Sequence, residues 1–284
     1  MKVRMFCIIN FIFSSFVFAQ APIPEEFLTY PVYIKLSNGG SATGFYYSDS
    51  TNFFLVTAKH VFFDPNTNRL NSQDADLISY PRDPYKNPYN LLKCNLKLLI
   101  EKNLVRYDNQ FDVAIALIGK NEKIDSIDFM IYYNDAISKT QDSKASRVNS
   151  FSRLYALESK KLPVGTEVHI FGYPSSVGTK QAQQLELMQP LFRRGIVAGK
   201  NYKLNTIILD CPVYMGNSGG PVVASIIRGF TTEFYLIGIV SQFVPFEEKW
   251  INDKYGYANT EWSNSGYSII APIEIMLDLM KQFK

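Results

Sequence analysis

Residues 216–221 read Gly216-Asn-Ser-Gly-Gly-Pro221, a turn in which one serine stands among glycines just before an apolar run. A serine hydroxyl becomes an effective nucleophile when a base removes its proton and donors receive the charge that develops on the substrate oxygen. Glycine permits backbone dihedrals that turn several N–H groups into one small pocket. We expect Ser218 to be a nucleophile, with the N–H groups of Gly216 and Ser218 as the oxyanion hole. The alternative is an ordinary glycine-rich hairpin turn.

The base for this serine must be one of two histidines, His60 and His169. His60 ends Leu55-Val-Thr-Ala-Lys-His60, which is typical of a buried strand that runs out into a loop. A strand end is where a rigid scaffold presents catalytic groups. His169 lies between two apolar residues in the middle of a predicted strand, as a packed or surface side chain does. His60 is therefore the predicted base, although an isolated histidine is more often structural.

A third group must orient the imidazole and stabilise its charged form. Asp112 opens Asp112-Val-Ala-Ile-Ala-Leu-Ile118, so its carboxylate is expected to be partly buried. A buried carboxylate is costly unless it has a partner such as histidine. Asp108 lies in a polar stretch and is expected in a solvated loop. Asp112 is the predicted partner of His60; the alternative is a residue that merely starts a strand.

Short apolar segments separated by turn signals form two groups along the chain. They are residues 31–36, 43–47, 53–57 and 112–118, and then residues 165–171, 194–198, 206–209, 220–224 and 234–240. Apolar residues at near-helical spacing predict one amphipathic helix over residues 272–283. Residues 64–90 are expected to be a long surface loop, and residues 120–160 a polar connection or insertion. The pattern predicts an all-β protein with two halves, either barrels or sandwiches.

Residues 1–19 have the layout of a signal peptide. Lys2 and Arg4 precede an apolar run, and Ala19 is a small residue at the expected cleavage point, which makes Gln20 the first mature residue. The run is too short to span a membrane comfortably. We expect a protein exported to the periplasm or secreted, without a stable membrane anchor.

The charge and the cysteine count exclude several kinds of partner. Two of the positive charges behind the formal net charge of +3 lie in residues 1–19, so the remainder is nearly neutral. This argues against nucleic acid or an anionic membrane as a partner. After removal of Cys7 only Cys94 and Cys211 remain, either as a disulfide or as two separate buried thiols. With two histidines, a zinc site is not expected, and no metal or cofactor is implied.

The order His60, Asp112, Ser218 carries a family resemblance. The segments that carry it are Thr57-Ala-Lys-His60, Phe111-Asp-Val-Ala-Ile115, Gly216–Pro221 and Gly238-Ile-Val-Ser241. They resemble motifs of the trypsin-like (chymotrypsin-fold) serine peptidases, from about residue 30 to the end of the chain. The resemblance implies two packed antiparallel β-barrels with a C-terminal helix. It also implies peptide-bond hydrolysis of protein or peptide substrates through a Ser-His-Asp triad and an acyl-enzyme.

Within the resemblance, residues 20–125 would form the first barrel with His60 and Asp112, and residues 161–284 the second with Ser218. Residues 126–160 would connect them. The bacterial HtrA-type protease domain looks most similar, because Asn217 replaces the acid that pairs with a newly cut N-terminus in digestive enzymes. About 43 residues follow Gly238-Ile-Val-Ser241, too few for the PDZ domain that HtrA proteins usually carry. The oligomeric state is left open.

The resemblance also predicts the residues that contact substrate. The base of the specificity pocket falls near Pro212 and Val213, where no acid stands, so cleavage after Lys or Arg is not expected. Val213, Val240 and Ser241 would favour an apolar or small side chain at the cleavage site. Gln242 and Phe243 would flank the substrate, with Phe243 narrowing the cleft or standing as a plain surface aromatic.

Two other functions compete with this interpretation. A catalytically weak binding or effector module on the same fold would result from a collapsed oxyanion loop or a blocked cleft. A lipase-type esterase would use a Gly-x-Ser-x-Gly elbow with its histidine later in the chain. Gly216–Gly220 fits that pattern, but neither histidine follows it.

Overall fold

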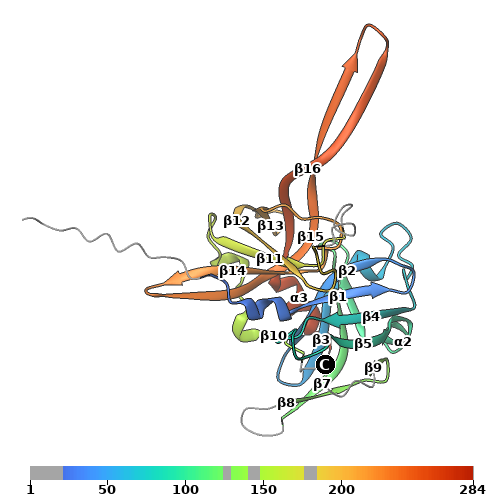
Figure 1. Ribbon diagram of the computed structural model, residues 1–284, viewed down its shortest axis with the longest axis vertical. Helices are drawn as coiled ribbons and strands as arrows, with labels where there is room; N and C mark the ends of the chain where they lie inside the picture. The colour runs from blue at the N-terminus through green and yellow to red at the C-terminus, as the bar shows by residue number, and fades with distance from the viewer. Residues whose placement is uncertain (1–21, 124–128, 140–147, 176–183, 284) are drawn as a thin grey trace, which may run out of the picture.

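Two β-sheets and several short helices, one of them C-terminal, make up the computed structural model, which describes residues 22–123, 129–139, 148–175 and 184–283 (Figure 1). The expected signal peptide of residues 1–19, with Cys7, lies outside the described residues. No helix among the described residues is long and apolar enough to cross a membrane.

The first sheet takes its ten strands from the N-terminal half. They are β1 (Pro31–Leu36), β2 (Ser41–Ser48), β3 (Asn52–Ala58), β4 (Asp74–Ser79), β5 (Asn90–Asn95), β6 (Val105–Asp108), β7 (Val113–Lys123), β8 (Phe129–Tyr133), β9 (Ile137–Lys139) and β10 (Phe151–Ser152). The hydrogen-bonded order is β6-β7-β3-β2-β1-β4-β5-β9, with β8 on β7 and β10 on β2. All pairs are antiparallel except β10 with β2.

The second sheet closes into a six-stranded barrel in the order β11-β12-β13-β16-β15-β14. Its strands are β11 (Glu167–Gly172), β12 (Leu191–Asn201), β13 (Thr206–Asp210), β14 (Pro221–Arg228), β15 (Thr231–Asn252) and β16 (Tyr257–Pro272). The prediction of a trypsin-like pair of β-barrels with a closing helix is confirmed. The first sheet does not close on itself through strand-to-strand hydrogen bonds, whereas the second sheet does.

The helices are short and lie outside the sheets. They are η1 (Glu25–Thr29), α1 (Lys59–Phe62), α2 (Leu96–Glu101), η2 (Arg153–Tyr155), η3 (Ser159–Lys161) and α3 (Ile273–Met280). Helix α3 confirms the predicted C-terminal helix, and its apolar face is buried through Ile273, Met276, Leu279 and Met280. The Glu274 carboxylate on the same helix accepts hydrogen bonds from the backbone and hydroxyl of Ser159.

Three apolar clusters hold the fold together. The first lies inside the N-terminal sheet, and the third fills the closed barrel around Val168, Leu209 and Ile237. The second joins the two halves. It contains Phe54 and Ile115 from the first sheet, Val223 from the second, and the buried face of α3. Burial of this apolar surface supplies most of the attraction between the halves.

The expectation of a long loop over residues 64–90 is wrong. Strand β4 lies within it and pairs with both β1 and β5. Its sequence, Asp-Ala-Asp-Leu-Ile-Ser, buries only alternate residues, Ala75, Leu77 and Ser79. The two aspartates and the final serine resemble a loop in composition, and the period of two in burial reveals the strand only in hindsight. Residues 120–160, expected as a connection or insertion, supply β8, β9 and β10 to the first sheet.

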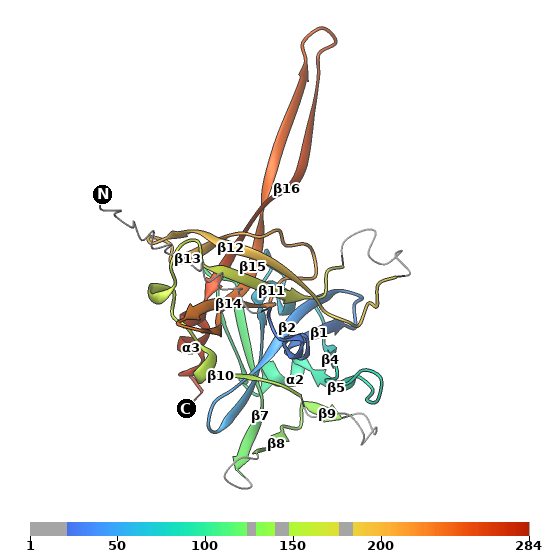
Figure 2. The ribbon, with the colours of Figure 1, turned by 60° about the vertical axis from the view of Figure 1, so that its left-hand side comes forward.

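Strands β15 and β16 extend far beyond the barrel as a two-stranded hairpin (Figures 1 and 2). The sequence predicts a strand only over residues 234–240, but β15 continues to Asn252 and returns as β16 from Tyr257. We define the projecting hairpin as residues 245–264, which pair regularly from Pro245 with Asn264 to Asn252 with Tyr257. Gly256, at a φ of 67°, belongs to the turn at its tip.

Candidate active site

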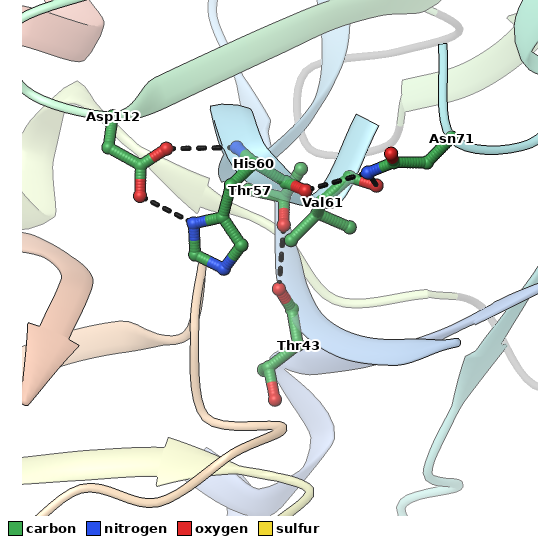
Figure 3. A network of polar contacts seen from close by, with 6 residues as sticks. All are labelled: Thr43, Thr57, His60, Val61, Asn71 and Asp112. Carbon is green, nitrogen blue, oxygen red and sulfur yellow. Dashed lines mark hydrogen bonds and ion pairs between the residues drawn. The ribbon is translucent and has the colours of Figure 1, made fainter. Parts of the chain in front are cut away.

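His60 and Asp112 meet at the end of the first sheet, where Asp112 binds two atoms of the histidine (Figure 3). The Asp112 Oδ2 atom lies 2.6 Å from the His60 Nδ1 atom, and the His60 backbone N–H donates to Asp112 Oδ1 at 2.9 Å. The two side chains are 38% and 27% exposed, so the pair is partly shielded from water. A carboxylate on Nδ1 fixes the ring orientation and leaves Nε2 as the outward nitrogen.

Local structure around Asp112 explains how this pair forms. Asp112 immediately precedes β7 and has a φ of 56°, in the left-handed region that non-glycine residues rarely adopt. Its backbone carbonyl accepts a hydrogen bond from Lys59 N at 2.9 Å. Such a conformation costs about 1 kcal/mol or more and persists where the surroundings impose it. Here three hydrogen bonds to residues 59 and 60 impose it.

His60 lies in the single-turn helix α1 rather than in the strand end or loop that the sequence predicts. Strand β3 ends at Ala58, and the chain then turns within the helix. Asn71 holds this turn, because its Nδ2 donates to the carbonyl oxygens of His60 and Val61 at 2.8 and 3.2 Å (Figure 3). The amide of Asn71 thus fixes the backbone that carries the imidazole.

Ser218 lies in a turn between β13 and β14, half-buried, with glycines in unusual conformations on either side. Gly216 has a φ of 92° and Gly219 a φ of 82°. A Cβ atom at Gly216 would clash with the Tyr173 carbonyl oxygen, and one at Gly219 would clash with the Thr57 hydroxyl. Only glycine therefore satisfies both the conformation and the space at these two positions.

The backbone N–H groups of this turn divide into two sets. Those of Asn217, Gly219 and Gly220 donate to the carbonyls of Tyr214, Val240 and Asn217 at 3.0, 2.8 and 2.9 Å. Those of Gly216 and Ser218 have no acceptor among the described residues. The Met215 carbonyl belongs to the same peptide group as Gly216 N, and it accepts a hydrogen bond from Ser175 N at 2.8 Å, which fixes the orientation of that group. The two N–H groups expected to bind an oxyanion are thus the two left unused.

Thr43, on β2, connects the serine turn to the first sheet, and sequence reasoning missed it. Its N–H donates to the Ser218 carbonyl at 3.1 Å, and its hydroxyl donates to the Gly216 carbonyl at 2.6 Å. The same hydroxyl accepts from Tyr173 N, and the Thr43 carbonyl accepts from the Thr57 hydroxyl. Thr43 is fully buried. Its position in an apolar segment offered no signal, because a strand threonine usually serves β propensity alone.

These contacts place the Ser218 turn against the end of β3. A Cβ at Gly219 would lie 2.7 Å from the backbone nitrogen of Ala58, two residues before His60. No hydrogen bond between Ser218 Oγ and His60 Nε2 is present among the described atoms. Catalytic hydrogen bonds in the absence of substrate are often long and shorten when substrate binds.

Of the two rejected residues, His169 lies where the sequence predicts, whereas Asp108 is not in a solvated loop: it is half-buried at the end of β6 and pairs with Val113. His169 is in the middle of β11, 4% exposed, with Nε2 against the Ser225 hydroxyl at 2.9 Å and the Glu167 carboxylate at 3.2 Å. Burial lowers the pKa of His169, and the negative Glu167 opposes this effect in part. Asp108 Oδ1 accepts from the N–H groups of Gln110 and Phe111 in a turn.

The predicted substrate-contacting residues fall into two groups. Val213 and Val240 are 2% and 1% exposed and belong to the core of the closed barrel. Ser241 is half-buried, and Gln242 and Phe243 are exposed at the base of the hairpin. The Val240 backbone binds the serine turn in both directions, accepting from Gly219 N and donating to the Gly220 carbonyl at 3.0 Å.

The two cysteines are free and buried in different apolar clusters. Burial raises the pKa of Cys94 to about 12 and that of Cys211 to about 11, so both stay protonated thiols at neutral pH. Of the two possibilities left open by the sequence, separate thiols are what the structure has. Among the described residues, no group of three or more His, Cys, Asp or Glu could hold a metal ion.

Comparisons with known proteins give a family and several distantly similar solved structures. No curated protein sequence matches the chain. Among solved structures, the HtrA-type protease AlgW with a tripeptide is 15% identical, with a TM-score of 0.46 over 89% of this chain and 58% of its own. Deg5 is 15% identical, with a TM-score of 0.48 over 88% and 86% of the two chains. The inactive form of the Rv3671c protease is 13% identical, with a TM-score of 0.43 over 89% and 88%.

A family model described as a trypsin-like peptidase domain matches residues 42–226. This stretch is well over half of the chain and runs from β2, which carries Thr43, past the Ser218 turn into β14. Through this match the chain belongs to the trypsin-like peptidase family, and it is a serine endopeptidase.

Proposed function

We propose that the protein cleaves peptide bonds with Ser218 as nucleophile, His60 as general base and acid, and Asp112 as the group that orients the imidazole. The observation that carries the proposal is the unused pair of N–H groups at Gly216 and Ser218, on a turn whose other N–H groups are all engaged. Donors held in advance toward a developing oxyanion are usually the largest single contribution to such catalysis.

In the proposed reaction, His60 Nε2 takes the proton of Ser218 Oγ as the oxygen attacks the substrate carbonyl. The carbonyl oxygen becomes negative and accepts hydrogen bonds from Gly216 N and Ser218 N. His60 then gives its proton to the leaving amine as the peptide bond breaks, which leaves an acyl group on Ser218. Water, deprotonated by the same imidazole, hydrolyses this ester and restores the serine. Asp112, on Nδ1, stabilises the imidazolium formed in both halves of the reaction.

The substrate pocket is proposed to accept an apolar or small side chain. The position near Pro212 and Val213 offers no carboxylate, and Val240 and Ser241 complete an uncharged lining. Gln242 and Phe243 would contact the residues beside it. A Lys or Arg side chain would lose its hydration there without gaining an ion pair.

The remaining parts of the proposal concern location and organisation. The apolar run with Lys2, Arg4 and Ala19 supports export to the periplasm or the cell exterior, with cleavage near Ala19. The two halves, residues 20–125 and 161–284, carry His60 with Asp112 and Ser218 respectively. Protein or peptide substrates are the expected partners.

A fluorophosphonate probe tests the activity directly, because it forms a covalent bond only with an activated serine. Wild-type protein should be labelled, Ser218→Ala should not, and His169→Gln should be labelled like wild type. Cleavage of a mixed peptide library should then occur after apolar or small residues. Absence of wild-type labelling would contradict the triad, and strong cleavage after Lys or Arg would contradict the pocket assignment.

A catalytically weak binding module on the same fold is the second candidate. This candidate predicts a folded protein that binds peptide but reacts with the probe no faster than the His60→Ala variant.

A further inference from the structure

The projecting hairpin grows directly out of the strands that hold the Ser218 turn. On β15, Val240 exchanges two backbone hydrogen bonds with Gly219 and Gly220, and the hairpin follows five residues later. On β16, the Asn264 side chain donates to the Val213 carbonyl at 2.6 Å, just ahead of the same turn. A polypeptide at Ser218 therefore lies beside the base of the hairpin.

Both outer edges of the hairpin are unpaired in the part of the chain that the structure describes. Strand β14 pairs with β15 only as far as Ile239, and β13 pairs with β16 only from Tyr267 onward. From Ser241 outward, the backbone N–H and C=O groups on the second edge of β15 have no described strand beside them. Such an edge can accept an extended peptide as an additional strand.

One face of the hairpin combines carboxylates with exposed aromatic rings. Alternation along β15 and the pairing register place Phe246, Glu248, Trp250, Tyr257 and Glu261 on the same side, and we call this set the acidic–aromatic face. Phe246, Trp250 and Tyr257 are 50%, 61% and 59% exposed. Glu248 and Glu261 stand directly opposite each other across the strands, an arrangement that destabilises a sheet when nothing lies between the charges.

The charge of the hairpin selects the kind of partner. Residues 245–264 contain four carboxylates (Glu247, Glu248, Asp253, Glu261) against two amines (Lys249, Lys254). A Lys or Arg side chain between Glu248 and Glu261 would compensate both carboxylates, with Trp250 close enough for a cation–π contact. Anionic lipid or nucleic acid would be repelled by the same charges.

We propose that the acidic–aromatic face binds a basic, partly apolar segment of the polypeptide substrate, outside the residues at the cleaved bond. The segment would lie along the free edge of β15, so that main-chain hydrogen bonds give affinity and its Lys or Arg side chains give specificity. Glu248 is seven positions after Ser241, which corresponds to roughly 23 Å of extended strand. A basic residue about seven positions from the cleaved bond would therefore reach the carboxylate pair. This inference rests on the proposed function for the identity of the bound chain.

The two tryptophans of the protein provide a direct readout, because both lie on the hairpin and on opposite faces. Trp250 belongs to the acidic–aromatic face, while Trp262 pairs with Glu247 on the other, and they are 61% and 62% exposed. Variants Trp262→Phe and Trp250→Phe, each in a Ser218→Ala background, give one fluorescent reporter per face. Binding then becomes measurable without any catalysis.

The probes are two peptides of about twelve residues, long enough to span roughly 40 Å when extended. The first peptide has Thr at every second position and Lys or Leu in turn at the positions between. The second peptide has the same sequence with Glu in place of every Lys. The basic peptide should shift the emission of Trp250 to shorter wavelength and leave that of Trp262 nearly unchanged. Glu248→Gln with Glu261→Gln should weaken its binding about tenfold, whereas Glu247→Gln, on the opposite face, should have little effect.

Several results would overturn the proposal. They are equal binding of the acidic peptide, a response of Trp262 instead of Trp250, a shift with neutral lipid vesicles, or a concentration-dependent shift without peptide that indicates a second copy. Peptides with the basic segment on the N-terminal or the C-terminal side of a cleavable bond then test substrate use. The double variant Glu248→Gln, Glu261→Gln should cleave at least one of these peptides with a lower kcat/KM than wild type. Its kcat/KM for a four-residue substrate should be unchanged.

Failure of the proposed function would look different from failure of this inference. An unlabelled wild-type protein that still binds the basic peptide would reject the peptidase mechanism and retain the docking surface. A labelled, active enzyme that shows no Trp250 response and no preference for flanking Lys or Arg would reject the docking surface alone.

Discussion

The Ser218 turn and the projecting hairpin are joined through Val240 and Asn264 but are stabilised in opposite ways. The turn is held by Thr43 of β2, which is fully buried and makes four hydrogen bonds to residues of both halves. Beyond the contact of Asn264 with Val213 at its base, the described hairpin is held by its own cross-strand pairs, and its aromatic side chains face solvent. An isolated two-stranded hairpin is marginally stable in water. The comparison indicates that one region is built for fixed geometry and the other for contact with something else.

The largest expected effect is at the centre of the fixed region. Asp112→Asn should lower kcat/KM by roughly four orders of magnitude, because an amide in place of the Oδ2 atom favours the wrong tautomer of His60. Steady-state kinetics on a peptide substrate measure the loss. Asp108→Asn is the matched control, since an asparagine oxygen can still accept from Gln110 and Phe111. A loss in Asp112→Asn no greater than in this control would contradict the assigned role.

An intermediate effect is expected at Thr43, because a substitution there would remove the hydrogen bonds that make the turn more rigidly held than the hairpin. Thr43→Val keeps the shape but leaves Tyr173 N and the Gly216 carbonyl without their partner, which should lower the free energy of unfolding by about 2–3 kcal/mol. The rate of fluorophosphonate labelling should fall as well, because the oxyanion turn loses its anchor. Thr43→Ser retains the hydroxyl and should behave nearly as wild type. Denaturant unfolding and labelling rates provide the two measurements.

The smallest effect is expected on removal of the hairpin itself. Replacing residues 246–263 by Asn-Gly joins Pro245 to Asn264 through a two-residue turn of the kind that hairpins favour. The free energy of unfolding should change by less than about 1 kcal/mol, because the removed side chains are mostly exposed. Hydrolysis of a four-residue substrate should be preserved. A large loss of either property would mean that the hairpin supports the barrel, and the contrast drawn above would disappear.

The sequence predicts what depends on local patterns. Glycines beside Ser218, an acid before an apolar strand and a histidine after one are visible in short windows, and the structure places His60 against Asp112 accordingly. Contacts between distant residues are not visible in this way. Thr43 and Gly216 are 173 positions apart, and nothing in an apolar strand marks a threonine that will bind across two halves. Strand β4 escaped notice because its pairing partners, β1 and β5, supply the order that its composition lacks.

The hairpin was missed for another physical reason. Its strands contain charged and polar residues on both faces, so the alternation that identifies a half-buried strand is absent. The hairpin is formed by the pairing of β15 with β16 and the turn at Gly256, and neither of its faces packs against a core. Only the cluster of Trp and Tyr residues in an otherwise polar stretch could have suggested an exposed surface with a role.

Helix α3 has a consequence for the order of assembly. Its buried residues complete the cluster shared by both halves, yet they follow every strand in the chain. During synthesis, both sheets can therefore gain their internal contacts before the last apolar surface between them is covered. Docking of α3 then completes the apolar cluster that joins the half carrying His60 to the half carrying Ser218.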